Sequence, residues 1–329
     1  MISLKNNLIA NSIRSYLREN VIKGDRPWYD EDEALTTIEK QIHDPYLKSK
    51  VMDMVTKGFC VVENSVDSNQ IDKAMDSFFE WKRRHSADLK PFMRNEIALD
   101  RIINIHNTLP EFTPLFTENK SLKVQDYLYK GETALYTSLF FEQGSTQGIH
   151  RDIPVFWTLP GYHYFGTWVA LEATDKDNGP LIVMAKGHKI PVIDRAALGR
   201  EFHADPKNIP ANNEEMWNSY QTKVRSLCAE MGLIEEQVHV NKGDTIVWHP
   251  LLPHGGAPIL NWERTRYSLV VHTTPVGVPV YHQDVFFNPA KRVPIKPVWG
   301  YDEKNGRKIA QTGGLSIGHG STFDFSKLV

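Results

Sequence analysis

Three side chains in two short motifs have the chemistry of a metal site. His150 and Asp152 stand two positions apart in segment 147–152, so a β-strand there would direct an imidazole and a carboxylate toward one face. Two ligands alone do not make a useful site, and His254 offers a third donor just after a strand expected at residues 244–248. The two glycines that follow His254 let backbone and ligand approach closely.

Two imidazoles and one carboxylate on one face form the facial triad typical of non-haem iron(II), with positions left open for a bidentate cosubstrate and dioxygen. The His-x-Asp motif alone is equally consistent with a surface salt bridge that arose by chance. His249 competes with His254 as the third ligand, because it lies at the end of the expected strand, before Pro250.

A second motif has the chemistry of a carboxylate-binding site. Arg266 and Ser268 share one face of a strand expected within residues 263–272. A guanidinium beside a hydroxyl suits a free carboxylate, because it forms paired, charge-assisted hydrogen bonds. Arg264, two positions earlier on the same face, is an alternative, and either arginine could instead cap the rim of a barrel or pair with Glu263.

The elements that must position these side chains are short strands. From about residue 132 onward, aromatic or β-branched runs alternate with Gly, Pro, Asn and Asp. The expected strands are residues 133–142, 164–172, 181–185, 244–248 and 267–273. This pattern predicts a mainly β barrel or sandwich with flanking helices.

The N-terminal part is expected to pack on this barrel. Residues 1–110 are predicted to be mostly helical, with a strand at 58–63 and a helix that begins at Asp67 and Ser68. Residues 111–280 are expected to form the catalytic core.

Two further segments complete the expected organisation, which is that of one functional domain. A helical insertion is predicted at about residues 191–238, with its helix near 214–231. Residues 281–329 are rich in Pro and Gly and are predicted to be a loop-rich C-terminal extension.

The composition excludes several classes of protein. With 41% hydrophobic and 24% charged residues, the chain is neither disordered nor fibrous. Its 38 Lys and Arg nearly balance 40 Asp and Glu without a basic block, which argues against a nucleic-acid-binding protein. A small molecule is therefore the expected partner, and nothing indicates the oligomeric state.

The expected location is a reducing cytoplasm. Cys60 and Cys228 are the only cysteines, too few for a disulfide framework or a Cys-based zinc site. Residues 1–20 carry no uninterrupted apolar core or cleavage site of a secretory signal. No run is long and apolar enough to cross a bilayer, so no membrane partner is expected.

Taken in order, these motifs resemble the phytanoyl-CoA dioxygenase family of iron(II)- and 2-oxoglutarate-dependent oxygenases. The resemblance covers roughly residues 51–275 and rests on residues 58–63, His150 to Asp152, 168–172 continuing to Gly179, Gly187 with His188, Gly243 with Asp244, His254 with Gly255, and Arg266.

The resemblance implies a double-stranded β-helix (jelly-roll, cupin-like) barrel. The residues that match the family's metal ligands are His150, Asp152 and His254, and Arg266 matches the residue that binds the distal carboxylate of 2-oxoglutarate. Iron(II) is thus the implied metal, with 2-oxoglutarate and dioxygen as cosubstrates. The resemblance also favours His254 over His249.

Further contacts to the cosubstrate follow from the resemblance. Gly256 stands where family members often carry a hydroxyl, a contact that Ser268 can replace. Tyr136, which shares a strand face with Phe140, is a candidate contact, and Trp168 is a candidate wall of the pocket. Ordinary packing in the core explains Tyr136 and Trp168 as well.

The candidates for the substrate pocket lie around the metal motif. They are Arg151, Phe156, Trp157 and Phe140, because an aromatic run begins just beyond the metal ligands. His188 is expected to organise a turn.

The sequence therefore predicts a dioxygenase that hydroxylates an unactivated C–H bond of a small molecule, with release of succinate and carbon dioxide. Halogenation is disfavoured, because related halogenases replace the carboxylate by a small residue whereas Asp152 is present here. Desaturation, epimerisation and ring formation use the same ligands and stay open.

Two other interpretations also stay open. A catalytic zinc hydrolase uses three protein ligands and a water molecule, but it leaves Arg266 unexplained and lacks a nearby Glu base on a helix. A non-catalytic, cupin-like barrel would bind a sugar or another ligand without turnover.

Overall fold

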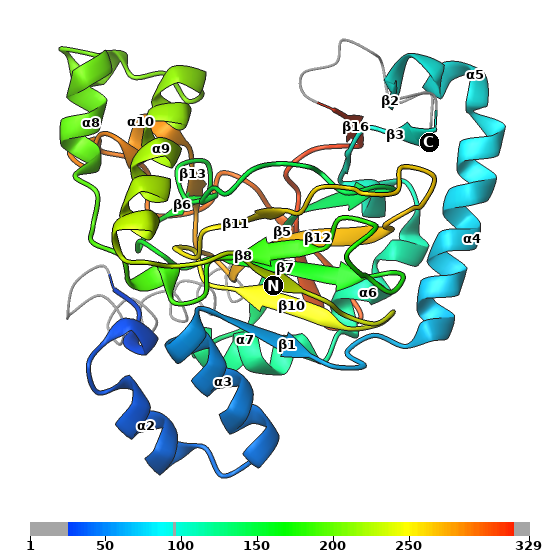
Figure 1. The fold of residues 1–329 in the computed structure, drawn as a ribbon, viewed down its shortest axis with the longest axis horizontal. Helices are drawn as coiled ribbons and strands as arrows, with labels where there is room; N and C mark the ends of the chain where they lie inside the picture. Colours follow the sequence, from blue (N-terminus) through cyan, green and yellow to red (C-terminus); the bar gives the residue numbers. More distant parts are fainter. Residues whose placement is uncertain (1–25, 95–96, 319–329) are drawn as a thin grey trace, which may run out of the picture.

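Two largely antiparallel sheets, one large and one small, face each other in the computed structural model, which describes residues 26–94 and 97–318 (Figure 1). Residues 1–20, where no secretory signal is expected, lie outside these ranges. The large sheet contains, in spatial order, β1 (Phe59–Val62), β10 (Thr245–Trp248), β7 (Phe165–Ala170), β12 (Ser268–Pro275) and β5 (Thr133–Phe141). The small sheet contains β11 (His254–Gly256), β8 (Leu181–Val183) and β9 (Glu236–Val238).

This arrangement is the jelly-roll fold that the resemblance implies. The five strands expected from the sequence coincide with β5, β7, β8, β10 and β12, and the strand expected at residues 58–63 is β1. Those predictions are confirmed.

Large side chains fill the space between the two sheets. Trp168 of β7 and Ile246 and Trp248 of β10 pack against Leu181 and Val183 of β8, and all five are buried. Because successive residues of a strand point to opposite faces, the residues between them face outward, toward the helices.

Helix α4 (Ser68–Arg84) covers the outer face of the large sheet, at the right in Figure 1, and continues into the short α5 (Ser86–Leu89). It begins where the sequence predicts, and the carboxylate of Asp67 accepts a hydrogen bond from the backbone N–H of Asn69 at 2.8 Å. The ring of Phe78 lies 4.6 Å from that of Phe140 on β5. This contact joins α4 to one hydrophobic core, in which α6 (Pro114–Thr117) also lies.

Three other helices cover the outer face near β1. They are α2 (Ala34–Gln41), α3 (Pro45–Lys57) and α7 (Ser121–Tyr129). Val51 of α3 and Val124 of α7 pack with Val62 of β1 and Val247 of β10. Helix α3 ends at Gly58, whose φ of 88° is a backbone conformation that favours glycine.

The predicted insertion contains two helices at the end of the sheet opposite α4 (Figure 1). Helix α8 (Arg195–Phe202) and helix α9 (Glu214–Glu230) lie between β8 and β9 in the sequence. Met216, Tyr220 and Val224 form the buried face of α9 and pack in one core with α10 (Gln283–Phe286). The predicted helix near residues 214–231 is thus confirmed.

The C-terminal part is more regular than the loop that the sequence predicts. A hairpin of β14 (Tyr301–Lys304) and β15 (Arg307–Ala310) turns at Asn305 and Gly306, with φ of 49° and 73°. Ile309 of β15 pairs with Leu135 of β5, so the hairpin extends the large sheet.

Four short pairings remain, two in the large sheet and two that form separate two-stranded sheets. β16 (Ser316–Ile317) pairs with β4 (Ile102–Ile103), β13 (Val280–Tyr281) with β6 (Trp157–Thr158), and β2 (Met93–Arg94) with β3 (Ala98–Leu99). β4 also pairs with β5.

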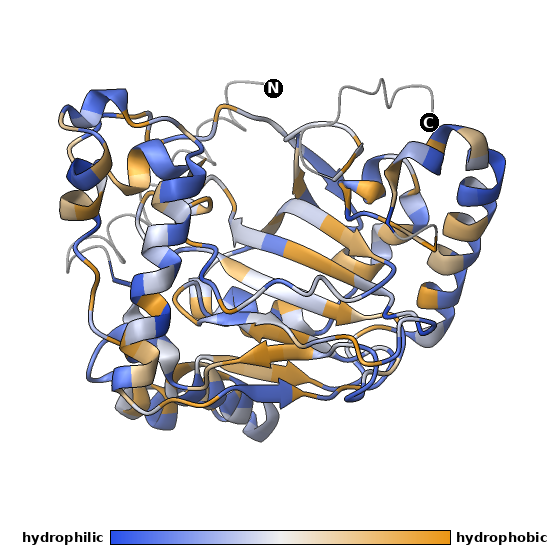
Figure 2. Ribbon diagram, turned by 45° about the horizontal axis from the view of Figure 1, so that its top comes forward, coloured by the Kyte–Doolittle hydropathy of each residue, from blue (hydrophilic) through white to orange (hydrophobic). Residues whose placement is uncertain are grey.

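Hydropathy follows this layering. In Figure 2 the central strands carry much of the orange, whereas the flanking helices alternate between orange and blue, as helices with one buried face do. Among residues 26–94 and 97–318, every helix is too short or too polar to span a bilayer.

Candidate metal centre and cosubstrate pocket

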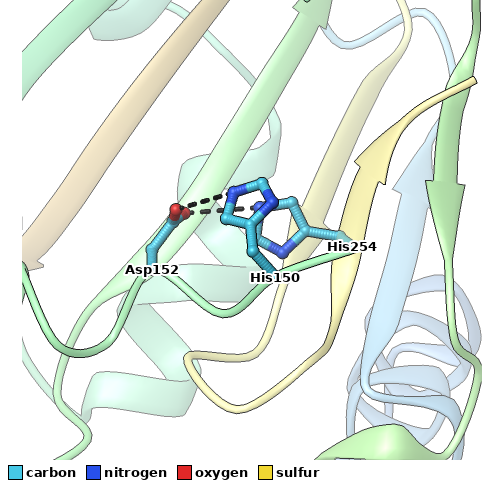
Figure 3. A group of neighbouring side chains, drawn as sticks. All are labelled: His150, Asp152 and His254. Carbon is cyan, nitrogen blue, oxygen red and sulfur yellow. Dashed lines mark ion pairs between the residues drawn. The ribbon is translucent and has the colours of Figure 1, made fainter. Parts of the chain in front are cut away.

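Backbone pairing brings His150 and His254 together. The N–H of each residue donates to the carbonyl oxygen of the other, both at 2.9 Å, and the two rings lie 4.6 Å apart. Asp152 lies at a bend beyond this pair, so the motif is not the regular strand that the sequence predicts. Its carboxylate nevertheless turns toward both imidazoles (Figure 3).

The glycines after His254 make this pairing sterically feasible. A Cβ on Gly255 would lie 2.7 Å from the carbonyl oxygen of Gln147, and one on Gly256 would lie 2.8 Å from Oγ of Ser145. The N–H of Gly256 donates to the same Gln147 oxygen at 2.9 Å. Strand β11 can therefore lie directly against the segment that leads to His150.

The tautomers of both histidines follow from their hydrogen bonds. Nδ1 of His150 lies 2.8 Å from the carbonyl oxygen of Gly148, and Nδ1 of His254 lies 3.0 Å from that of Leu252. Because a carbonyl oxygen only accepts, both Nδ1 atoms carry hydrogen, so Nε2 of each ring is the atom that can bind a metal ion. Such bonds orient histidines that bind metals.

Both Nε2 atoms face the carboxylate of Asp152. Nε2 of His150 lies 3.2 Å from its Oδ1 and Nε2 of His254 lies 3.4 Å from its Oδ2 (Figure 3). One donor atom from each residue lies within 4.8 Å of the other two. Three electron-pair donors around one point, two nitrogens and one oxygen, fit iron(II).

Asp152 stays ionised in this surrounding. Burial alone would raise its pKa, but nearby His254 and the hydrogen bonds of the surrounding histidines hold the pKa of this carboxyl well below its usual value. One of those bonds comes from His272 on β12, 3.4 Å from Oδ2 and absent from the sequence-based site. Arg266, Ser268 and His272 are separated by even numbers of residues, so they share one face of a strand. This spacing is the signal that could have identified His272.

Arg266 is a buried cation that forms no ion pair with a carboxylate among the described residues. It is 3% exposed, and its guanidinium donates to the carbonyl oxygen of Gly179 at 2.8 Å and to Oγ of Ser268 at 3.4 Å. Its Nε has no partner among the described residues, and burial lowers its pKa to about 10. A buried guanidinium with only neutral acceptors fits an anionic ligand.

Arg264 points elsewhere. It forms an ion pair with Asp175 at 2.7 Å, and its side chain is 37% exposed. The choice of Arg266 over Arg264 is therefore supported by their positions.

A cavity of about 950 Å³ joins the metal ligands to Arg266. Trp168 lies on its wall, with its ring 5.4 Å from the guanidinium carbon of Arg266. Tyr136 and Phe156 also line it, as the sequence predicts. Ser268 is buried and contacts Arg266, but it does not itself line the cavity.

Phe140 does not line this cavity, which corrects the sequence-based assignment. The pairing of β12 with β5 shifts between His272 and Thr273, so Tyr136 is an extra residue on β5, a β-bulge. Beyond the bulge, Leu139 faces the cavity whereas Phe140 faces α4. The bulge reverses the alternation on which the prediction was based.

Arg151 and Trp157 do not line the cavity either. Arg151 is 2% exposed, and its guanidinium donates to the carbonyl oxygen of Gly187 at 2.6 Å. Trp157 is buried against Phe286 and Arg195, whose guanidinium lies 3.9 Å from its ring. The structure therefore places neither residue on the cavity lining, since the side chain of Arg151 reaches Gly187 and residues of α8 and α10 cover Trp157.

His249, the competing third ligand, is engaged elsewhere. Its Nε2 lies 3.1 Å from Oδ1 of Asp30, and its Nδ1 accepts a hydrogen bond from the N–H of Leu251 at 3.1 Å. His188 lies in a 3-10 turn, with Nε2 3.1 Å from the carbonyl oxygen of Val55.

Comparison with known proteins agrees with this geometry. A family model described as phytanoyl-CoA dioxygenase (PhyH) matches residues 54–268, well over half of the 329 residues. The chain belongs to this family. Family members depend on iron(II) and 2-oxoglutarate, and the donor set and the buried Arg266 fit both.

Individual relatives are distant. The peroxisomal phytanoyl-CoA dioxygenase of Bos taurus is 24% identical over 228 residues, which cover 60% of this chain and 60% of the bovine protein. The chain thus spans less than two thirds of that relative.

Two solved structures share the fold. The epimerase SnoN from nogalamycin biosynthesis has a TM-score of 0.54 and 14% identity, covering 80% of this chain and 98% of its own. EctD from S. alaskensis, solved with 2-oxoglutarate and 5-hydroxyectoine, has a TM-score of 0.54 and 15% identity. The match covers 82% of this chain and 88% of EctD.

Proposed function

We propose that this chain is an iron(II)- and 2-oxoglutarate-dependent oxygenase that hydroxylates an unactivated C–H bond of a small molecule. The observation that carries the proposal is that His150, Asp152 and His254 line the same cavity as the buried Arg266, which forms no ion pair among the described residues. Iron(II) bound with 2-oxoglutarate supplies the oxidation of a C–H bond, coupled to the formation of succinate and carbon dioxide.

The side chains of the cavity have separate tasks in this proposal. His150, Asp152 and His254 hold the metal from one side and leave the cavity side open. Arg266, supported by Ser268, holds the far carboxylate of 2-oxoglutarate by charge-assisted hydrogen bonds. The rings of Trp168 and Trp248 exclude water from this end, which strengthens those bonds.

The ligand set narrows the reaction type. Asp152 would be the carboxylate ligand of the metal, which related halogenases replace by a small residue, so hydroxylation is favoured over halogenation. Epimerisation, the reaction that the name of the epimerase SnoN gives, and ring formation use the same ligand set and stay open as alternatives. Hydrolysis at zinc is disfavoured, because Asp152 and Glu214 are the only acids of the described cavity lining and Glu214 is exposed.

The test is the formation of succinate by metal-free protein supplied with iron(II), ascorbate and 2-oxoglutarate. The proposal predicts succinate with iron(II), none with zinc, and none in Asp152→Ala or His150→Ala under the same conditions. Succinate formation that persists in both variants, or activity with zinc that needs no 2-oxoglutarate, would contradict it.

A further inference from the structure

Helix α9 of the insertion forms a wall beside the metal centre. Trp217 and Asn218, in its first turns, both line the cavity. The ring of Trp217 lies 6.0 Å from that of His150, with 47° between the ring planes. A molecule bound next to the metal therefore contacts this indole.

A reciprocal pair of hydrogen bonds fixes the wall to the metal motif. The N–H of Arg151, which lies between the two ligands, donates to Oε1 of Gln221 at 2.9 Å. Nε2 of Gln221 donates back to the carbonyl oxygen of Arg151, also at 2.9 Å. Because Gln221 follows Trp217 by one helical turn, on the same side of α9, this clamp sets the position of the indole relative to His150.

The cavity is unusually rich in carboxamides. Six line it, Asn104, Gln147, Asn212, Asn213, Asn218 and Gln283. Three of them have structural partners, since Asn104 binds Ser138 and Thr137, Asn213 caps α9, and Gln283 accepts from the N–H of Asn213.

The other three carboxamides, Gln147, Asn212 and Asn218, form no side-chain hydrogen bond within the described part of the chain. Each presents both a donor and an acceptor to a ligand. Paired donors and acceptors beside an aromatic face suit hydroxyl groups on a ring, because a hydroxyl both donates and accepts and the C–H face of such a ring is apolar.

The charges of the described lining cancel. Two arginines, Arg101 and Arg266, stand against two carboxylates, Asp152 and Glu214. Iron(II) and the dianion of 2-oxoglutarate also cancel each other. The lining therefore offers no net charge to attract an anionic substrate.

We infer that the substrate is a neutral, hydroxyl-rich ring, a pyranose or another cyclic polyol, that lies face-on against Trp217 and hydrogen-bonds to Asn218, Asn212 and Gln147. This inference rests on the proposed oxygenase function, since the ring must present a C–H bond to the metal. Trp217 determines specificity in this arrangement, and Gln221 is a positioning residue that acts through it.

The test measures the binding of defined probes to the full chain loaded with manganese(II) and 2-oxoglutarate. The probes for calorimetry are methyl pyranosides of the common hexoses, free amino acids and a short acyl-CoA. We expect at least one pyranoside to bind and the charged probes not to bind. Trp217→Ala should weaken that binding about tenfold or more, the effect of losing one aromatic anchor, whereas Trp217→Phe should retain most of it.

Trp262→Ala provides the matched control, because Trp262 is 42% exposed and lies outside the cavity, against Arg94. It should bind the pyranoside as the wild type does. Asn218→Ala, at an exposed position of α9, gives a second variant if Trp217→Ala does not fold.

Three results would overturn the inference: no pyranoside binds, a charged probe binds instead, or both Trp217→Ala and Asn218→Ala bind the pyranoside as tightly as the wild type. Succinate formation with iron(II) and 2-oxoglutarate alone, measured on the same wild-type protein, separates this failure from that of the proposed function. If succinate forms but no pyranoside binds, the substrate class alone is wrong. If no succinate forms, the oxygenase proposal itself fails.

Discussion

Nε2 of His272 lies 3.4 Å from Oδ2 of Asp152, and its ring stacks on Phe156 with centroids 4.0 Å apart. Because a carboxylate only accepts, Nε2 carries the hydrogen and donates it. The other ring nitrogen is buried without a partner among the described residues. His272 therefore holds the carboxylate of Asp152 in place and is not itself a ligand of the triad.

Replacement of His272 by Leu should weaken metal binding. Loss of a group that orients a metal ligand costs about 10–100-fold in affinity. His272→Gln should retain much of the affinity, because the glutamine amide reaches the same region and also donates. Calorimetric titration of metal-free protein with manganese(II) measures both. His239→Gln, at an exposed position, is the control and should bind manganese(II) as the wild type does. If His272→Leu bound manganese(II) as tightly as the wild type, His272 would not orient Asp152.

Arg266→Ala should raise the 2-oxoglutarate concentration needed for succinate formation by roughly a hundredfold, about 3 kcal/mol, because a charge-assisted pair of hydrogen bonds is lost. Arg264→Ala should change this requirement little, because its exposed ion pair with Asp175 lies away from the cavity. The measurement is the KM for 2-oxoglutarate of each variant. A larger effect at Arg264 would reverse the assignment.

Gly166→Ala should destabilise the fold and disturb the site together. Gly166 lies opposite Trp248, and a Cβ there would lie 1.9 Å from the indole. The indole must move, and its ring packs 4.6 Å from that of His254. We expect a loss of about 2 kcal/mol in the free energy of unfolding, with weaker metal binding.

Gly131→Ala is the control for that substitution, because the nearest atom to its Cβ would be 3.9 Å away. Urea unfolding and manganese(II) titration of both variants test the contact. Equal stability and equal affinity for Gly166→Ala and the wild type would show that the indole adapts without cost.

His106 should make stability depend on pH. It is buried, with Nδ1 2.7 Å from Oγ of Ser138, and burial lowers its pKa from 6.5 to about 4. The unfolded chain then binds this proton at a higher pH than the folded chain. The stabilisation is therefore full above pH 6.5 and is lost as the pH falls toward 4.

His106→Asn removes this titration. The decrease in the free energy of unfolding between about pH 6.5 and pH 4.5 should be smaller in the variant by about 2 kcal/mol. Urea unfolding at the two pH values measures it. A decrease as large in His106→Asn as in the wild type would mean that the imidazole titrates normally in the folded protein.

The sequence predicts the framework of this protein well, for physical reasons. The runs that become β5, β7, β10 and β12 are β-branched or aromatic and bounded by turn residues, so local pattern and tertiary structure agree. The sequence identifies the three donors of the triad by residue type and motif, and their donor atoms come within reach of one metal ion once β11 pairs with His150. A bend, and not the expected strand, turns Asp152 toward the two imidazoles.

The failures arise where one residue changes the register or where distant segments decide the surroundings. The bulge at Tyr136 moved Phe140 to the outer face, and no residue type in β5 signals it. Trp157 is a candidate for the substrate pocket by sequence because it follows Phe156, but residues of α8 and α10 bury it. Trp217 was not identified because its place depends on the docking of α9, which only the clamp to Arg151 explains.

The most direct test of the central claim is an anaerobic titration of metal-free protein with iron(II), followed by 2-oxoglutarate, in the wild type and in His150→Ala, Asp152→Ala and His254→Ala. We expect one equivalent of tightly bound iron(II) per wild-type chain, binding of 2-oxoglutarate that requires the metal, and loss of the tight site in each variant. Undiminished iron binding in the His254→Ala variant, or 2-oxoglutarate binding that is indifferent to the metal, would contradict it.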